Sequence, residues 1–172
     1  MSKDLKPHIG IFGRRNSGKS SLINLLTGQD IAIVSDTAGT TTDPVKKSIE
    51  IFGVGPCVLV DTAGIDDVGE LGQQRVEQTM KALEELDCAI LVITGNQFEE
   101  PEQQLVNRMK ELAVPFFVVH NKADEQALLA VIKAVIEQKY GVKVLDFSVS
   151  RNDDIAPLVD MLKKIIPESA YQ

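Results

Sequence analysis

Short apolar runs alternate with segments whose apolar residues recur at helical spacing along most of the chain. The runs predict strands because turn-forming residues bound them, and they occupy residues 8–12, 45–52, 57–60, 89–93, 115–120 and 142–147. Three other stretches place apolar side chains on one helical face: Leu105, Met109 and Leu112; Leu128, Ile132 and Val135; and Ile155, Leu158, Val159, Leu162 and Ile166. This alternation predicts an α/β domain with helices on both faces of a largely parallel sheet.

One pair of runs departs from the alternation. Runs 45–52 and 57–60 are separated only by Gly53-Val54-Gly55-Pro56, which predicts a hairpin between antiparallel neighbours. We therefore expect a six-stranded, mostly parallel sheet with one antiparallel strand and about five helices. No linker or repeat interrupts it, so we expect a single domain over 1–172, with frayed ends at 1–7 and 168–172.

Composition narrows the class of protein. The chain is 44% hydrophobic and 25% charged, which is ordinary for a soluble globular domain. No apolar run approaches the ~20 residues that span a bilayer, and no signal peptide is recognisable, so we expect a cytoplasmic protein without a membrane partner. The net charge of −7 argues against a nucleic-acid partner. Cys57 and Cys88 lie in apolar runs and are interpreted as reduced core thiols.

A phosphate-binding motif follows the first predicted strand. Its residues match G-x-x-x-x-G-K-[ST] from Gly13 to Ser20. The glycines let the backbone N–H groups approach phosphate oxygens, lysine reaches the β- and γ-phosphates, and the last hydroxyl binds Mg²⁺. The residues predicted to bind GTP here are Gly13, Asn16, Ser17, Gly18, Lys19, Ser20 and Ser21, with Ser20 also a Mg²⁺ ligand. Arg14 and Arg15 are interpreted as solvated loop charges.

A second motif predicts that the base is guanine. Asn121, Lys122 and Asp124 follow the run 115–120 and match Asn-Lys-x-Asp. The Asp124 carboxylate can accept hydrogen bonds from the guanine N1–H and its exocyclic amine, a donor pair that adenine lacks. Asn121 is expected to tie this loop to the phosphate loop, and the Lys122 stem to lie along the base. Ser148 and Val149 resemble the weaker motif that contacts the guanine oxygen.

Two further segments predict nucleotide-dependent switches. Asp61 and Gly64 belong to an Asp-x-x-Gly motif, in which the carboxylate holds Mg²⁺ and the glycine N–H senses the γ-phosphate. Upstream, the stretch 39–43 resembles the first-switch pattern Gly-Thr-Thr-x-Asp of GTPases, and this resemblance implies Thr41 as a Mg²⁺ ligand; Thr40 and Thr42 are the alternatives.

The expected water-orienting glutamine is absent. Ile65 follows the Asp-x-x-Gly motif, and an aliphatic side chain cannot orient the attacking water. Among the acidic residues that follow, Glu70 is the candidate for this role; the alternative is that it belongs to a solvated charged loop. We expect slow hydrolysis of GTP, with Lys19, Thr41, Gly64 and Glu70 as the candidate catalytic residues.

Together these motifs resemble the TrmE, Era and EngA branch of P-loop GTPases. Within that branch, the stretches 8–20, 39–45, 61–67 and 69–72 are similar to HydF, the GTPase family of FeFe-hydrogenase maturation; Thr42, where the branch normally has arginine, is shared with it. The resemblance runs from about residue 8 to 167. It implies a Ras-like P-loop fold, with hydrogenase maturases and the hydrogenase as partners.

The resemblance also implies a cation and a dimer. Several members of the branch hold K⁺ beside the phosphates, through the asparagine found here as Asn16, and pair their domains across the switch regions. It implies further HydF domains for dimerisation and an iron–sulfur cluster; the chain has neither, so we expect an isolated GTPase domain. Two alternatives remain: a partner-binding module whose hydrolysis is incidental, and an Era- or TrmE-like GTPase of ribosome assembly or tRNA modification.

Overall fold

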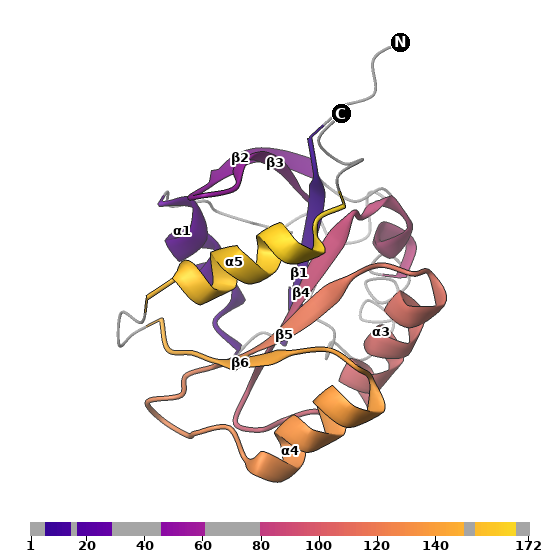
Figure 1. The fold of residues 1–172 in the computed structure, drawn as a ribbon, viewed down its shortest axis with the longest axis vertical. Coiled ribbons are helices and arrows are strands. Elements are labelled where there is room, and N and C mark those ends of the chain that lie inside the picture. Colours follow the sequence, from indigo (N-terminus) through magenta and orange to yellow (C-terminus); the bar gives the residue numbers. More distant parts are fainter. Residues whose placement is uncertain (1–5, 15–16, 29–45, 61–79, 150–153, 168–172) are drawn as a thin grey trace, which may run out of the picture.

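The computed structural model describes residues 6–14, 17–28, 46–60, 80–149 and 154–167 (Figure 1). Its strands form one six-stranded sheet in the order β2-β3-β1-β4-β5-β6. Only the β2–β3 pair is antiparallel, and every other neighbour is parallel. The predicted sheet is confirmed. The strands are β1 (His8–Gly13), β2 (Lys46–Ile51), β3 (Gly55–Val60), β4 (Cys88–Thr94), β5 (Phe116–Asn121) and β6 (Val144–Asp146).

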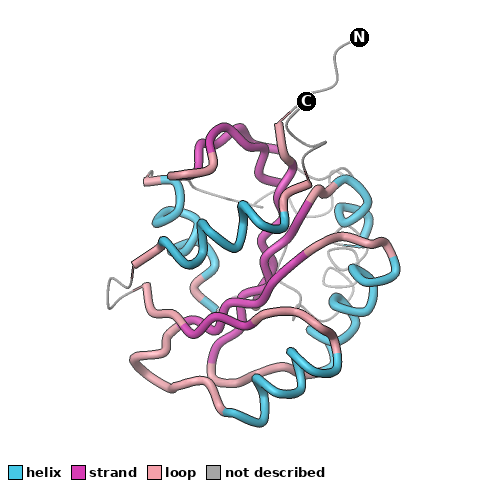
Figure 2. Tube along the Cα trace, in the orientation of Figure 1, coloured by secondary structure: helices cyan, strands magenta, loops and turns pink. Residues whose placement is uncertain are grey.

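Helices cover both faces of the sheet (Figures 1 and 2). On one face, α1 (Lys19–Thr27) and α5 (Ala156–Ile165) share a core with β1, β3, β4 and β5. On the other face lie α3 (Glu100–Glu111), α4 (Ala130–Ala134) and the short 3-10 turn η2 (Leu83–Glu85). The predicted stripes on α3 and α5 face these cores, since Leu105, Met109, Leu158 and Leu162 are fully buried. No helix of the described residues is long and apolar enough to cross a membrane.

The β2–β3 hairpin turns one step earlier than its sequence predicts. Ile51 pairs with Gly55, so the turn is residues 52–54, while Gly55 and Pro56 already belong to β3. Gly53 takes φ +79°, and a Cβ there would lie 2.8 Å from Val159 Cγ1. Proline has no N–H to donate to a neighbouring strand. The strand tolerates Pro56 because β3 pairs with β1 only from Val58 onward, so no hydrogen bond to β1 is lost at Pro56.

The predicted stripe through α4 is wrong at its last residue. Val135 is 40% exposed, whereas Ile136 is fully buried. The helix widens into a π-helical turn, Val135–Lys139, and the extra residue in that turn shifts the inward-facing position by one. The turn also delivers Tyr140 to the core, where its ring meets Phe98 edge-on at 5.7 Å between centroids.

The two cysteines are buried and free, as predicted. Burial raises the pKa of the Cys57 thiol to about 11. Burial raises the pKa of Cys88 further, with smaller contributions from Cys57 and Asp87. Both thiols are therefore interpreted as protonated core side chains at neutral pH.

Candidate functional site

The predicted binding motifs meet at the carboxyl-terminal edge of the sheet. Parallel strands β1, β4, β5 and β6 all end at this edge, and the loops that follow them are adjacent in space. In open α/β sheets, ligands bind in this position, just beyond the carboxyl ends of the strands. The relevant loops are 14–18, 95–99, 122–129 and 147–149.

The phosphate-binding loop forms a tight turn between β1 and α1. The Arg14 carbonyl accepts hydrogen bonds from both the backbone N–H and the hydroxyl of Ser17, at 3.0 and 2.7 Å. Gly18 then takes φ +83° as the N-cap of α1. A Cβ on Gly13 would lie 2.6 Å from Ser17 Oγ and 2.9 Å from the Val92 carbonyl oxygen. Both glycines are therefore required by the packing and the backbone of this loop.

The first turn of α1 presents the remaining phosphate-site residues. Lys19 and Ser20 are its first two residues, and the side chains of Ser20 and Ser21 are exposed. The Ser20 hydroxyl is a hard oxygen donor suited to Mg²⁺. The other predicted ligands, Thr41 and Asp61, lie outside the described residues, as do Asn16, Gly64 and Glu70. Elsewhere in the described ranges, no three His, Cys, Asp or Glu side chains form a metal-binding group.

Asn121 joins the loops of the site, as predicted. It is the last residue of β5 and only 2% exposed. Its Nδ2 donates to the Ser17 carbonyl of the phosphate-binding loop at 2.9 Å, while its Oδ1 accepts the Val149 N–H at 3.3 Å. A single buried amide thus holds together the loops after β1, β5 and β6.

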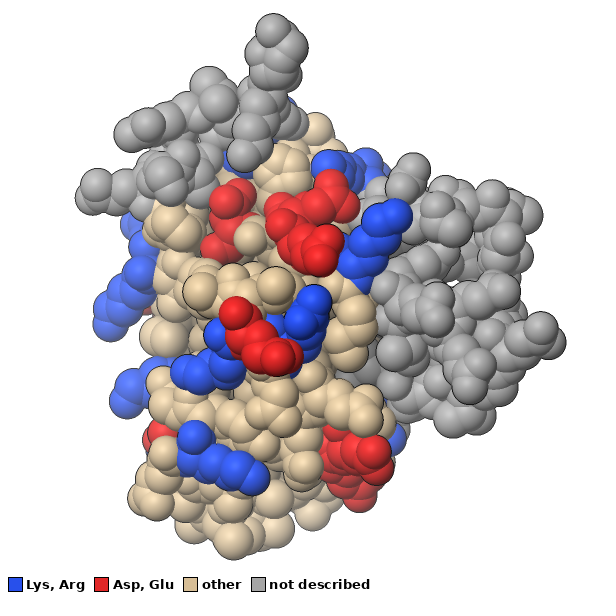
Figure 3. All heavy atoms as spheres, turned by 90° about the vertical axis from the view of Figure 1, so that its right-hand side faces the viewer, with Lys and Arg blue, Asp and Glu red and all other residues tan. Residues whose placement is uncertain are grey.

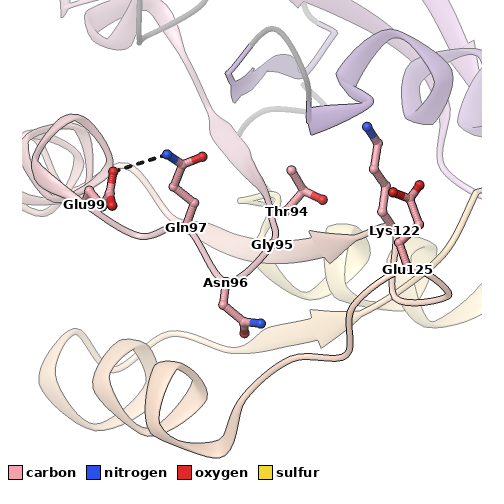
Figure 4. Close-up of a pocket in the computed structure, with 7 residues that line it drawn as sticks. All are labelled: Thr94, Gly95, Asn96, Gln97, Glu99, Lys122 and Glu125. Atoms are coloured by element: carbon pink, nitrogen blue, oxygen red, sulfur yellow. Dashed lines mark hydrogen bonds between the residues drawn. The ribbon is translucent and has the colours of Figure 1, made fainter.

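Lys122 and Asp124 belong to the loop that follows Asn121 and β5. Lys122 takes φ +62°, and its side chain reaches toward the β1–α1 segment (Figure 4). Asp124 is exposed, and the hydroxyl of fully buried Ser148 donates to its Oδ1 at 2.5 Å. Ser148 therefore orients the carboxylate while leaving one face of it accessible to solvent.

Arg14 is not a solvated loop charge, and that interpretation is wrong. Its Nε and Nη2 donate to the two carboxylate oxygens of Glu102 at 2.6 and 3.0 Å, and Nη2 also reaches Glu99 at 3.3 Å. The Arg14 side chain is 15% exposed and that of Glu102 only 2%. Glu102 also accepts the Glu99 N–H at the start of α3. The pair therefore anchors the phosphate-binding loop to the first turn of α3.

A polar cavity of about 370 Å³ adjoins the site (Figure 4). The loop after β4 forms one wall, and Lys122 and Glu125 form the other. Its lining residues are Thr94, Gly95, Asn96, Gln97, Glu99, Lys122 and Glu125. Sequence reasoning missed the role of this loop, and of Glu102, because their partners are distant in the chain. The acidic residues in the first turn of α3, Glu100 and Glu102, were the sequence feature that could have indicated a basic partner.

The family of the chain follows from comparison with known proteins. A family model described as 50S ribosome-binding GTPase matches residues 8–122. The tRNA modification GTPase MnmE of Hydrogenovibrio crunogenus is 39% identical over 115 residues, which are 66% of this chain and 25% of that protein. GTPase Der of Campylobacter hominis is 32% identical over 163 residues, or 92% of this chain and 34% of that protein. The chain thus spans about a quarter to a third of these relatives.

Solved structures agree with this result. A variant of Aquifex aeolicus Era bound to GDP and AlF4⁻ superposes with a TM-score of 0.73 at 28% identity, covering 94% of this chain and 57% of that one. Era in complex with MgGDPNP and nucleotides of 16S ribosomal RNA gives a TM-score of 0.71 at 28% identity, with the same coverage. The predicted Ras-like GTPase fold and the relationship to the TrmE, Era and Der branch are confirmed. Because the family match runs from the start of β1 to Lys122 and covers more than half of the chain, this chain belongs to the 50S ribosome-binding GTPase family.

Proposed function

We propose that this domain binds GTP with Mg²⁺ and hydrolyses GTP to GDP and phosphate, acting as a nucleotide-dependent switch. The observation that carries the proposal is the bridge made by Asn121, which fixes the phosphate-binding loop, the Asn-Lys-x-Asp loop and Val149 around one site. A nucleotide lying across these loops has its phosphates at the N-terminus of α1 and its base beside Asp124.

Each end of the nucleotide meets a group of matching chemistry. Asp124 would accept the guanine N1–H and exocyclic amine, and the Ser148–Val149 segment would lie beside the guanine oxygen, with the Val149 N–H donated to Asn121 Oδ1. Lys19 and the N–H groups of the loop stabilise the β- and γ-phosphates. Ser20, with Thr41 and Asp61, would hold Mg²⁺, which would supply positive charge to the β- and γ-phosphates.

Hydrolysis replaces one P–O bond with another. The oxygen of water bonds to the γ-phosphorus while the bond to the β–γ bridging oxygen breaks, its electron pair stays on GDP, and the water proton leaves to phosphate or solvent. Ile65 cannot orient this water, so Glu70 is our candidate. Arg14 is committed to Glu102, so this structure does not present it to the phosphates. A K⁺ ion held partly by Asn16 would supply the further positive charge that the transferring phosphoryl group needs.

Turnover in matched salts tests this mechanism. We expect GTP hydrolysis to be about tenfold faster in K⁺ than in Na⁺ at equal ionic strength, a barrier difference of about 1.4 kcal/mol. Asn16→Ala is expected to remove most of the difference while GDP binding persists. If domains pair through their switch regions, the K⁺ effect grows with protein concentration, and sedimentation in GDP with AlF4⁻ detects a homodimer. Equal rates in both salts at every concentration would refute the K⁺ mechanism.

The relatives favour a role connected with RNA. The name of MnmE describes tRNA modification, and one Era structure holds nucleotides of 16S ribosomal RNA. We propose that the switch serves ribosome assembly or tRNA modification, although on the face in Figure 3 acidic and basic side chains are interspersed rather than gathered into one basic surface. Binding of tRNA and 16S ribosomal RNA, compared in GDP and GTP, tests this. RNA binding that ignores the nucleotide, or no binding, would contradict it.

Hydrogenase maturation is the second candidate role. One sequence feature favours it: Thr42 in the first switch, which resembles the HydF family and not the arginine usual in the branch. The names of the relatives above do not point to this role. Nucleotide-dependent binding to FeFe-hydrogenase or its other maturases, without binding to RNA, would support this role over the RNA-linked one.

A further inference from the structure

A buried histidine lies directly behind the Asn-Lys-x-Asp loop. His120 is 0% exposed and precedes Asn121 at the end of β5. Its Nε2 lies 3.0 Å from the backbone nitrogen of Asn96, and its Nδ1 lies 2.9 Å from Asp146 Oδ1. A backbone N–H can only donate, so Nε2 must be the acceptor and Nδ1 must carry the proton. The ring is thus a neutral link between the loop after β4 and β6.

Asn96 holds the end of the Asn-Lys-x-Asp loop that precedes α4. It takes φ +57°, a conformation that asparagine tolerates better than most residues. Its Nδ2 donates to the Ala127 carbonyl at 3.0 Å, and its Oδ1 accepts the Leu129 N–H at 2.6 Å. Both contacts lie just beyond Asp124, before α4 begins.

Asp146 completes the arrangement. Its second oxygen, Oδ2, accepts the Leu128 N–H at 3.3 Å, while Oδ1 faces His120. The backbone of residues 127–129 is therefore hydrogen-bonded to the side chains of Asn96 and Asp146, and His120 connects these two residues. The other end of the loop is fixed where Thr94 Oγ1 donates to the Asn121 carbonyl at 3.1 Å.

We infer that Asn96, His120 and Asp146 are positioning residues for guanine selectivity: they hold residues 127–129, the end of the loop that follows Asp124. This inference rests on the proposed binding of guanine by Asp124. Hydrogen bonding to the guanine amine needs the carboxylate at a donor–acceptor distance near 2.9 Å, and the bond weakens steeply when distance or angle changes. None of the three side chains needs to touch the nucleotide to have this effect.

Two near-isosteric variants test the inference. In Asp146→Asn, one amide oxygen must serve two donors, the His120 ring and the Leu128 N–H, so one contact is lost. In Asn96→Asp, the Leu129 contact survives, but a carboxylate oxygen faces the Ala127 carbonyl. The measurement is the ratio of GDP to IDP affinity by calorimetry, because hypoxanthine lacks only the exocyclic amine. We expect each variant to lower the ratio about fivefold while IDP affinity stays close to wild type.

The control is Asp160→Asn, which removes the same charge from an exposed position on α5 and should leave the ratio unchanged. Circular dichroism confirms folding, and Asn96→Asp, at a half-buried loop position, serves if Asp146→Asn does not fold. An unchanged ratio overturns the inference. If GDP and IDP affinity fall equally, the variant has loosened the site in general; if neither falls, the three residues do not position Asp124. If the wild type itself fails to prefer GDP over IDP, the assignment of Asp124 fails instead.

Discussion

The two ends of the nucleotide site are stabilised in different ways. The phosphate-binding loop is joined to the start of α3 by one arginine, Arg14, whose main partner is buried Glu102 and whose second partner is exposed Glu99. The base-reading loop is held by many contacts from three elements, among them Asn96, Asp146 and Ser148. Support from one buried ion pair fails abruptly when one partner is lost, since the other charge is left uncompensated. Support spread over many hydrogen bonds weakens in small steps.

The largest expected effect comes from removing a phosphate contact outright. Lys19→Ala deletes the cation that faces the β- and γ-phosphates, and Ser20→Ala deletes a Mg²⁺ ligand. Each should lower GTP turnover by at least about 100-fold, as loss of a transition-state contact does elsewhere. Phosphate release measures this, with circular dichroism to show that the fold persists. Normal turnover in either variant would contradict the phosphate-site assignment.

At the base end, Asp124→Asn should cost about 100-fold in GTP affinity, since the amide presents a donor to the guanine amine. The same change should admit xanthine nucleotides, whose C2 carbonyl accepts from the new amide. Competition binding with GTP and XTP measures both. Unchanged affinity for GTP would show that Asp124 does not read the base.

Glu102→Gln tests the charged support of the phosphate-binding loop. We expect a loss of about 2 kcal/mol in the free energy of unfolding, because the amide cannot accept both guanidinium hydrogen bonds. Urea unfolding measures it. The matched control is Glu111→Gln on the same helix, whose side chain is 66% exposed and pairs only across the surface with Arg108. The two variants should differ clearly; equal stabilities would mean that the buried pair contributes no more than a surface one.

Ser148→Ala should give the smallest effect. It removes the hydroxyl that orients Asp124 but leaves the carboxylate in place, so we expect GDP affinity to fall about fivefold, or about 1 kcal/mol. Fluorescence titration with a labelled GDP detects a change of this size. A loss as large as that of Asp124→Asn would show that the base end also depends on one contact.

Sequence patterns predicted the elements whose cause is local. The six strands and the α5 stripe follow from periodicity. The Asn121 bridge spans 104 residues and is not local, but two recognisable motifs prescribe it. The α4 stripe was wrong because the π-helical turn after Ala134 displaces Val135 from the core, and periodicity assumes a constant turn. The pairing of Arg14 with Glu102 escaped prediction because 88 residues separate them and nothing local links a loop arginine to one helix terminus.

Gly18 has a consequence for how such domains evolve and are redesigned. A Cβ at this position would overlap Asn121 Nδ2 and would lie 3.8 Å from Lys122 Cε. Because Gly18 has no side chain, the phosphate-binding loop and the Asn-Lys-x-Asp loop can come into contact at this position. A single methyl group here would act as a wedge, separating the phosphate reader from the base reader. A phosphate-binding loop grafted from another protein would keep this contact only if it also carried glycine here, so one position links the two motifs.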